Sequence, residues 1–179
     1  MEMDIRSLRV SGNLENAKVE IERLGIDIEG VSEIKWTGVD DYWSDGYRDI
    51  ICSEDDRRIA GVAIILKKEW GRRLKAILPC NEIILMVKLE GEPMETAILQ
   101  VYMLTSCHAE EEIEEVLGQV KGKENLIIMG DWNAIINEGK EGRTAGNFGL
   151  SKRNAKGERI VEFCNEKNMV LAHILFEQH

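Results

Sequence analysis

The residues best suited to chemistry follow a short apolar segment, Leu126 to Met129. Four apolar residues in a row predict a buried strand, and Gly130 then frees the backbone. Asp131 and Asn133 come directly afterwards. A carboxylate and an amide at the end of a buried strand lie in the crevice where open sheets bind ligands. Gly, Asp and Asn are also common turn formers, so a simple turn is the alternative interpretation.

Two further polar residues lie at the ends of predicted strands. Glu33 comes near the end of one strand, and Tyr102 ends another. If these strands share a sheet edge, Glu33 and Asp131 can hold Mg²⁺, which prefers oxygen ligands and keeps several waters. A carboxylate there can also orient a water for attack on a phosphate ester, while Tyr102 and Asn133 donate to the phosphate oxygens. The alternative is that Glu33 is a surface charge and Tyr102 a core residue with an exposed hydroxyl.

Hydrophobic periodicity predicts the elements that carry these residues. An amphipathic helix covers residues 13–24, with Asn13 as its cap and Gly25 at its C′ position. A second helix presents an acidic face at 110–115, and a third covers 158–167. Strands are predicted over residues 5–10, 26–34, 47–52, 60–66, 74–78, 83–89, 96–102, 126–129 and 169–174, with a hairpin turn at 90–93.

Residues 39–48 are predicted to form a loop rich in Asp, Gly and aromatic side chains. The aromatic residues in and beside this segment either stack on nucleic-acid bases or pin the segment to the core; they are Trp36, Tyr42, Trp43 and Tyr47. Helices that flank sheet in a mixed order indicate an α/β or α+β sandwich.

Length and composition are those of an ordinary globular protein. The 179 residues fit one domain over positions 1–179, with 44% hydrophobic and 31% charged residues. No apolar run approaches about 18 residues, and the N-terminal residues lack the pattern of a secretory signal. The four cysteines are far apart and form no CxxC pair. Reduced thiols and an intracellular location are therefore expected.

The net charge of −10 opposes binding to a polyanion, since nucleic-acid backbones are held by Lys and Arg. Either the partner is not a polyanion, or the contact is local and is assisted by a divalent cation. A basic cluster does occur late in the chain; it comprises Arg143, Lys152, Arg153, Lys156 and Arg159.

Four blocks along the chain resemble, in the same order, the endonuclease/exonuclease/phosphatase superfamily. The nearest branch is the endonuclease domain of non-LTR retrotransposons, together with the craniofacial-development-protein-2-like sequences derived from it. The matching blocks are residues 28–36 (IEGVSEIKW), 100–102 (QVY), 128–134 (IMGDWNA) and 148–159, of which Phe148, Gly149, Asn154, Gly157, Glu158 and Arg159 match.

This resemblance implies a C-terminally truncated four-layer α/β sandwich of the DNase I-like type, with a Mg²⁺-dependent phosphodiesterase site for which Mn²⁺ is the alternative metal. Glu33 would bind the metal and Asp131 would activate the attacking water. Asn133 would contact the scissile phosphate, and Tyr102 would lie beside it. The remaining site residues implied are Asp4 as a second metal ligand, where the family carries Asn, and Asn154, Arg153 and Trp132 as substrate contacts.

Two further departures from the family pattern bear on activity. Met103-Leu104 stands where the family often has Ala-Pro or Met-Pro after the tyrosine. The closing blocks of the family, which carry a metal-linked aspartate and the catalytic histidine, are not in this sequence. His108, His173 and His179 do not match that histidine and read as ordinary loop or strand residues.

Three functions are consistent with these residues. The first is a Mg²⁺-dependent DNA endonuclease of the abasic-site or retrotransposon-target type, weak or inactive in this truncated form. The second is a catalytically dead, transposon-derived binding or structural module. The third is a phosphatase acting on small phosphate esters. The expected partner is DNA through weak local contact, without a membrane; self-association through an uncovered sheet edge is also expected. If DNA is the substrate, the nucleus is the expected location.

Overall fold

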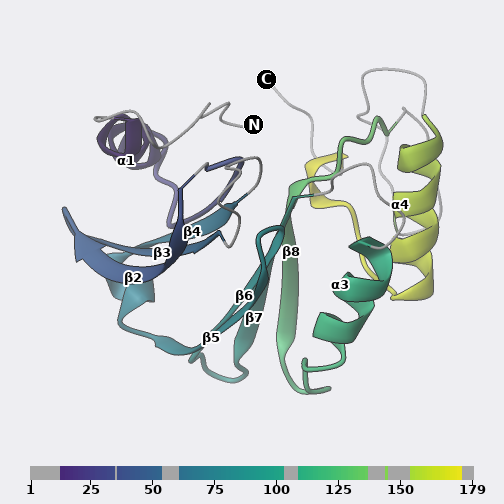
Figure 1. Cartoon of the computed structure of the whole chain (residues 1–179). Coiled ribbons are helices and arrows are strands. Elements are labelled where there is room, and N and C mark those ends of the chain that lie inside the picture. Colours follow the sequence, from purple (N-terminus) through teal and green to yellow (C-terminus); the bar gives the residue numbers. More distant parts are fainter. Residues whose placement is uncertain are drawn as a thin grey trace. The chain divides into compact units, whose positions relative to one another are not determined.

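The computed structural model describes residues 13–34, 36–53, 61–102, 109–136, 144 and 154–174 (Figure 1). The chain divides into two compact units, Met1–Asp131 and Trp132–His179, and each is described by itself. The single domain over 1–179 stays a prediction, and the predicted first strand over 5–10 lies outside the described residues. In the part of the chain that the structure describes, no helix is long and apolar enough to cross a membrane.

The described residues of the first unit form two four-stranded sheets. The first sheet is antiparallel throughout, with the strand order β1-β4-β3-β2. The second has the order β5-β6-β7-β8, and its last strand runs parallel to β7 while the other pairs are antiparallel. The strands are β1 (Ile28–Ser32), β2 (Gly38–Ser44), β3 (Tyr47–Ser53), β4 (Val62–Lys67), β5 (Leu74–Asn81), β6 (Ile84–Leu89), β7 (Thr96–Tyr102) and β8 (Asn125–Asp131); a short helix, α2 (Lys68–Gly71), follows β4.

Helix α1 (Asn13–Leu24) begins and ends at the predicted residues. Gly25 ends it in the left-handed conformation, with φ of 67°. The Ile26 N–H donates to the Ile21 carbonyl at 2.9 Å, and the Gly25 N–H donates to the Glu22 carbonyl at 3.2 Å. These two bonds form a Schellman motif, which satisfies carbonyls that the helix itself leaves unpaired.

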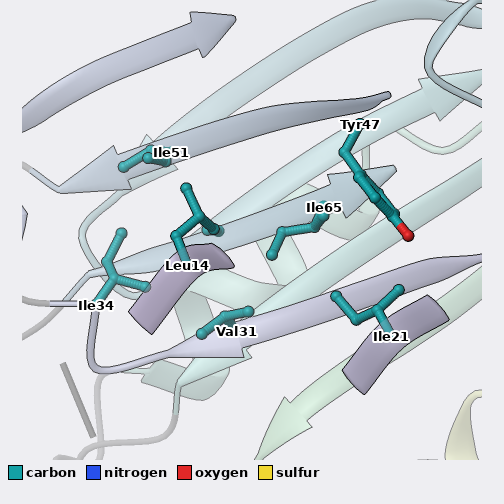
Figure 2. Packing of buried hydrophobic residues seen from close by; sticks show 8 residues of the cluster. Leu14, Ile21, Val31, Ile34, Tyr47, Ile51 and Ile65 are labelled. Atoms are coloured by element: carbon teal, nitrogen blue, oxygen red, sulfur yellow. The ribbon is translucent and has the colours of Figure 1, made fainter. Parts of the chain in front are cut away.

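The apolar face of α1 packs on the outer face of the first sheet (Figure 2). Leu14 and Ile21 of the helix meet Val31, Ile51 and Ile65 of β1, β3 and β4. Alternate side chains of a strand point to opposite faces of its sheet, so the other residues of these strands point away from α1. The cluster also includes Ile34, Tyr47 and Ala63.

The inner face of the first sheet packs on the second sheet. The Gln100 side-chain nitrogen on β7 donates to Ser32 Oγ on β1 at 3.0 Å, and Cys52 Sγ on β3 donates to the Asn81 carbonyl on β5 at 3.2 Å.

Helix α3 (Ala109–Leu117) covers the far side of the second sheet, and Figure 1 shows it on the side away from the first sheet. Asn81 Nδ2 donates to Glu112 Oε2 at 2.7 Å, and Lys88 Nζ donates to the Gln119 carbonyl at 2.9 Å. The first unit therefore has four layers, in the order helix, sheet, sheet, helix.

The predicted loop over residues 39–48 is wrong, because this segment forms the β2–β3 hairpin. Asp45 and Gly46 form its two-residue turn, with φ of 52° and 85°. Two central residues with positive φ define the turn type whose twist matches a hairpin, and Asp-Gly is one of its preferred sequences. The Asp-Gly signal was present, but the carboxylates of Asp40 and Asp41 hid the strand pattern before it.

The aromatic residues of this segment mostly pin the hairpin to the core. Trp36 and Tyr42 pack against the α1 cluster, and Tyr47 is buried in it. Trp43 is 49% exposed, and the Arg48 guanidinium lies 5.7 Å from the centre of its ring. The pinning interpretation therefore holds for three of the four side chains.

The second unit is built around helix α4 (Ala155–Glu166), whose buried face includes Ile160, Val161, Phe163 and Cys164. The strand predicted over residues 169–174 is wrong, because residues Ala172–Ile174 form a 3₁₀ helix that includes His173. The Leu171 N–H donates to the Thr144 carbonyl at 2.9 Å, and the Ile174 N–H donates to the Leu171 carbonyl at 3.3 Å. Apolar residues gave this segment a strand-like pattern, but the Met169 N–H donates to the Cys164 carbonyl of α4 at 2.8 Å, so the segment begins as the exit from a helix.

Strand β8 occupies an edge of its sheet and pairs with β7 within the described residues. Its side chains are only partly covered, and Ile127 is 48% exposed. Residues 126–129 therefore form the predicted strand, but the prediction that this strand is buried is wrong, because each of the four side chains is at least partly exposed. Self-association through this edge stays a prediction.

Candidate active site

Three of the predicted site residues, Glu33, Tyr102 and Asp131, come together in the first unit. β7 and β8 are parallel neighbours, and Tyr102 and Asp131 are direct partners at their ends. Glu33 follows the last residue of β1 in the facing sheet. The Tyr102 hydroxyl donates to Glu33 Oε1 at 2.5 Å, which joins two residues 69 positions apart in the sequence.

The alternation of side chains directs Tyr102 and Asp131 toward the first sheet. Gln100 precedes Tyr102 by two residues, and Met129 precedes Asp131 by two, so each pair shares a face of the sheet. A Cβ atom built on Gly30 of β1 would lie 1.8 Å from Gln100 Oε1 and 3.1 Å from the Met129 methyl. This face of the second sheet therefore packs against β1, the strand that Glu33 follows.

The electrostatics of the site keep the Tyr102 phenol neutral. Tyr102 is 8% exposed. Burial, the hydrogen bond to Glu33 and the nearby charges of Glu33 and Asp131 together raise its pKa to about 12. A neutral phenol is a hydrogen-bond donor, which is the role that the Tyr102 hydroxyl has toward the Glu33 carboxylate.

The backbone at both strand ends adopts positive φ. Glu33 has a φ of 58°, a conformation that costs an L-residue about 1–2 kcal/mol. Gly130 has a φ of 144°, and a Cβ atom there would lie 1.9 Å from the Val101 backbone oxygen. Only glycine allows β8 to approach β7 this closely just before Asp131. Strained residues of this kind cluster at functional sites.

The other predicted residues of the Gly-Asp-Trp-Asn block belong to the second unit. The Trp132 ring lies 6.3 Å from the Phe163 ring on α4. Asn133 is exposed and has a φ of 48°, which asparagine tolerates better than most residues. The substrate contacts predicted for these two residues stay predictions.

Asn154 has a structural role in the second unit. Its side-chain oxygen accepts from the Gly157 N–H at 2.7 Å and so caps α4. The same oxygen accepts from the Ile135 N–H at 3.1 Å, and the Asn154 N–H returns a bond to the Ile135 carbonyl at 3.2 Å. A substrate contact, if Asn154 makes one, would involve its amide nitrogen.

The donor set of the first unit fits a hard divalent cation. Mg²⁺ is usually held by one or two carboxylates and completes its shell with waters and substrate oxygens, and Glu33 and Asp131 supply two carboxylates on either side of Tyr102. Among the described residues, no group of three or more His, Cys, Asp or Glu side chains could hold a metal ion. Asp4, the predicted third carboxylate, and Arg153 lie outside the described residues.

Sequence reasoning did not identify Gln100 as a site residue. It is 1% exposed and lies two residues before Tyr102 on the same face of β7. The available signal was a lone amide inside an otherwise apolar part of a strand.

The chain is similar to curated proteins over almost its whole length. It is 34% identical to craniofacial development protein 2 of Bos taurus and 32% identical to the same protein of Tragulus javanicus, over 185 aligned residues in each case. Each alignment covers 98% of this chain, but the chain spans only 31% and 32% of the length of these relatives. No protein-family model matches the chain.

A solved structure shares the fold. The endonuclease domain of TRAS1, a telomere-specific non-LTR retrotransposon, superposes with a TM-score of 0.58 over 85% of this chain and 63% of that domain, at 17% identity. At this identity the likeness establishes the fold rather than the activity. The predicted resemblance and the α/β sandwich fold are both confirmed.

Proposed function

We propose, from the premise that this chain has the DNase I-like fold of the endonuclease/exonuclease/phosphatase superfamily, that it is a divalent-metal-dependent phosphodiester hydrolase of the DNA endonuclease type. Mg²⁺ is the proposed metal. The observation that supports this function is the convergence of Glu33, Tyr102 and Asp131 at adjoining strand ends.

Each of the three residues has a role that its chemistry supports. Glu33 is the proposed metal ligand, because its carboxylate offers hard oxygen atoms at a strand end. Asp131 is the proposed group that orients and deprotonates the attacking water. Tyr102, whose pKa is about 12, keeps its single hydroxyl proton and donates it to the Glu33 carboxylate; in a substrate complex it would donate to a phosphate oxygen in place of Glu33. A bound divalent cation would stabilise negative charge that develops on the phosphate.

DNA is the proposed substrate, and the charge of the chain limits how it binds. With a net charge of −10, the protein gains little long-range attraction for a phosphate backbone. Weak, local contact with DNA is consistent with this charge. The nucleus is the location proposed for an enzyme with this substrate. Arg153, Asn154 and Trp132 remain the proposed substrate contacts.

A second candidate function for the 179-residue segment is that of a binding module without cleavage. None of His108, His173 and His179 matches the histidine that the family resemblance assigns to catalysis. Loss of one electrostatic stabiliser of that kind typically costs a factor of about 10² to 10³ in rate. The 179-residue segment alone is therefore proposed to cleave very slowly or not at all.

A plasmid-nicking assay at saturating Mg²⁺, with supercoiled and abasic-site DNA, tests both functions. We expect slow nicking by the 179-residue segment, and its loss in Glu33→Ala and Asp131→Ala. The exposed carboxylates Glu69 and Asp27 supply matched controls, since Glu69→Ala and Asp27→Ala should leave the rate unchanged. Appending a family-like closing segment should raise the rate by orders of magnitude.

The outcomes separate the candidate functions. Nicking that survives both Glu33→Ala and Asp131→Ala would show that the chemistry resides elsewhere. If no nicking occurs with or without the appended segment, but Mn²⁺ or DNA still binds, the binding module is the correct function. Preferential hydrolysis of a small phosphate ester would instead identify a phosphatase.

A further inference from the structure

We infer that Gln100 is a positioning residue, which fixes the end of β1 and so holds the Glu33 carboxylate where a metal ion binds. This inference rests on the proposed function, because it takes Glu33 as the metal ligand. It concerns a residue that touches neither the metal nor the substrate and that acts through Ser32.

Gln100 connects the two sheets directly behind the site. It is 1% exposed, and its Nε2 atom donates to Ser32 Oγ at 3.0 Å. Ser32 is the last residue of β1, and Glu33 follows it. Two residues further along β7 on the same face, Tyr102 donates to Glu33 Oε1. The facing strands are therefore joined by two consecutive side-chain bonds, one at Ser32 and one at Glu33.

The close approach of the sheets at this point depends on glycine. A Cβ atom on Gly30 would lie 1.8 Å from Gln100 Oε1 and 3.1 Å from the Met129 methyl. Gly30, Gln100 and Met129 lie on β1, β7 and β8, the three strands at whose ends Glu33, Tyr102 and Asp131 lie. The contact at Gln100 thus sets the spacing of all three.

The energetics of Gln100 point to positioning rather than to stability. Its Oε1 atom is buried and has no hydrogen-bond partner among the described residues. A buried polar atom without a partner lowers stability, and an apolar side chain of the same shape avoids that penalty. An amide at this position is therefore unfavourable for packing. Its Nε2 atom donates to Ser32 Oγ at 3.0 Å and, at the longer distance of 3.5 Å, to the neighbouring Val101 carbonyl.

Glu33 needs such support because its backbone is strained. With a φ of 58°, it departs from the extended conformation of β1 directly after Ser32. A conformation of this kind persists only where the surroundings hold it. The supports are the Gln100–Ser32 bond before Glu33, the Tyr102 bond to its side chain, and the Ile34 N–H bond to the Gly61 carbonyl at 3.3 Å after it.

The test compares Gln100→Met, Ser32→Ala and the double variant with the wild-type chain. Mn²⁺ alone is the probe, and its affinity is measured from the free-ion signal in electron paramagnetic resonance. We expect each single variant to bind Mn²⁺ about 10- to 100-fold more weakly, the typical loss when a residue behind a metal ligand is changed. The double variant should lose little more than either single variant, and Gln100→Met should melt at the same temperature or higher.

Two control variants separate positioning from general damage. Leu99→Met changes the opposite face of β7 and should leave the Mn²⁺ affinity unchanged. Gln119→Met makes the same chemical change at an exposed site and should also leave the Mn²⁺ affinity unchanged. The bond from Lys88 goes to the backbone carbonyl of Gln119, so the substitution retains it.

The outcomes distinguish this inference from the proposed function. Loss of Mn²⁺ binding in Glu33→Gln but not in Gln100→Met overturns the inference and leaves the proposed function standing. If the wild-type chain binds no Mn²⁺, the proposed function fails, and backbone ¹⁵N relaxation of metal-free protein then decides the inference. Increased motion of the Glu33 amide in Gln100→Met, with Leu99→Met unchanged, supports positioning; an unchanged Glu33 amide overturns it.

Discussion

The first unit shields carboxylates in two places, and it does so in different ways. Behind α1, Lys18 Nζ lies 2.6 Å from Asp49 Oδ2, and the two side chains are 5% and 1% exposed. At the strand ends, Glu33 is only partly covered and receives its hydrogen bond from the neutral Tyr102. The first carboxylate is paired with a cation of the protein itself, whereas the second accepts a hydrogen bond from an uncharged donor.

This difference shows that burial of a charge does not by itself mark a functional site. Burial raises the pKa of the Asp49 carboxyl, and the hydrogen bond from Lys18 opposes this. Its backbone nevertheless lies within the regular strand β3. Glu33 combines positive φ, a position at a strand end and a second carboxylate beside the same tyrosine. Backbone strain together with converging polar groups is the more informative signal.

The largest expected effect is the loss of stability in Asp49→Asn. Removing one partner of a buried ion pair leaves the other charge uncompensated, which typically costs about 3–5 kcal/mol. Urea denaturation measures this change. The exposed Arg23–Glu20 pair provides the control, because Glu20→Gln should change stability by less than about 1 kcal/mol. Equal effects at the two pairs would remove the distinction drawn between buried and exposed charge.

Gly130→Ala should lower the free energy of unfolding by somewhat less than Asp49→Asn, roughly 1–3 kcal/mol, because of the backbone conformation of Gly130. The φ of 144° disfavours any side chain, and the Cβ atom would collide with the Val101 backbone oxygen. Gly122→Ala is the matched control, since a Cβ atom there meets nothing within 4 Å. Thermal unfolding measures both variants, and Mn²⁺ binding should weaken in Gly130→Ala alone.

Glu33→Gln makes nearly the same chemical change as Asp49→Asn but should leave stability within about 1 kcal/mol of wild type. The amide oxygen still accepts from Tyr102, and no buried cation loses its partner. Loss of Mn²⁺ binding with an unchanged urea midpoint would sharpen the contrast between the two carboxylates. A loss of stability as large as that of Asp49→Asn would contradict it.

The effect that appears only at high pH is a loss of stability that depends on Tyr47. Burial, together with the hydrogen bond to Glu22 and its charge, raises the pKa of Tyr47 to about 12. Because the folded state holds this proton more tightly, its stabilisation is complete below the ordinary pKa of about 10 and is lost as pH rises through 12. The difference in unfolding free energy between wild type and Tyr47→Phe should therefore shrink over this range.

The sequence by itself predicted the local elements whose signals lie within a few residues. The bounds of α1 followed from its apolar period and from Gly25, and the bounds of β7 followed from its apolar run. The positions of Glu33, Tyr102 and Asp131 at strand ends were equally accessible. The β2–β3 hairpin was missed because edge-strand carboxylates interrupted the apolar pattern, and the segment at 169–174 was misassigned because apolar residues also suit a buried 3₁₀ turn.

Only the tertiary structure decided which polar residues meet. Glu33 and Tyr102 are 69 positions apart, and Gln100 and Ser32 are 68 apart, so no local period relates them. Their contact depends on two sheets packing face to face, and that packing in turn depends on Gly30 having no side chain. The sequence determines which residues lie at the strand ends, but the packing of one sheet on the other determines their partners, because hydrogen bonds form only between atoms that the fold brings within about 3 Å.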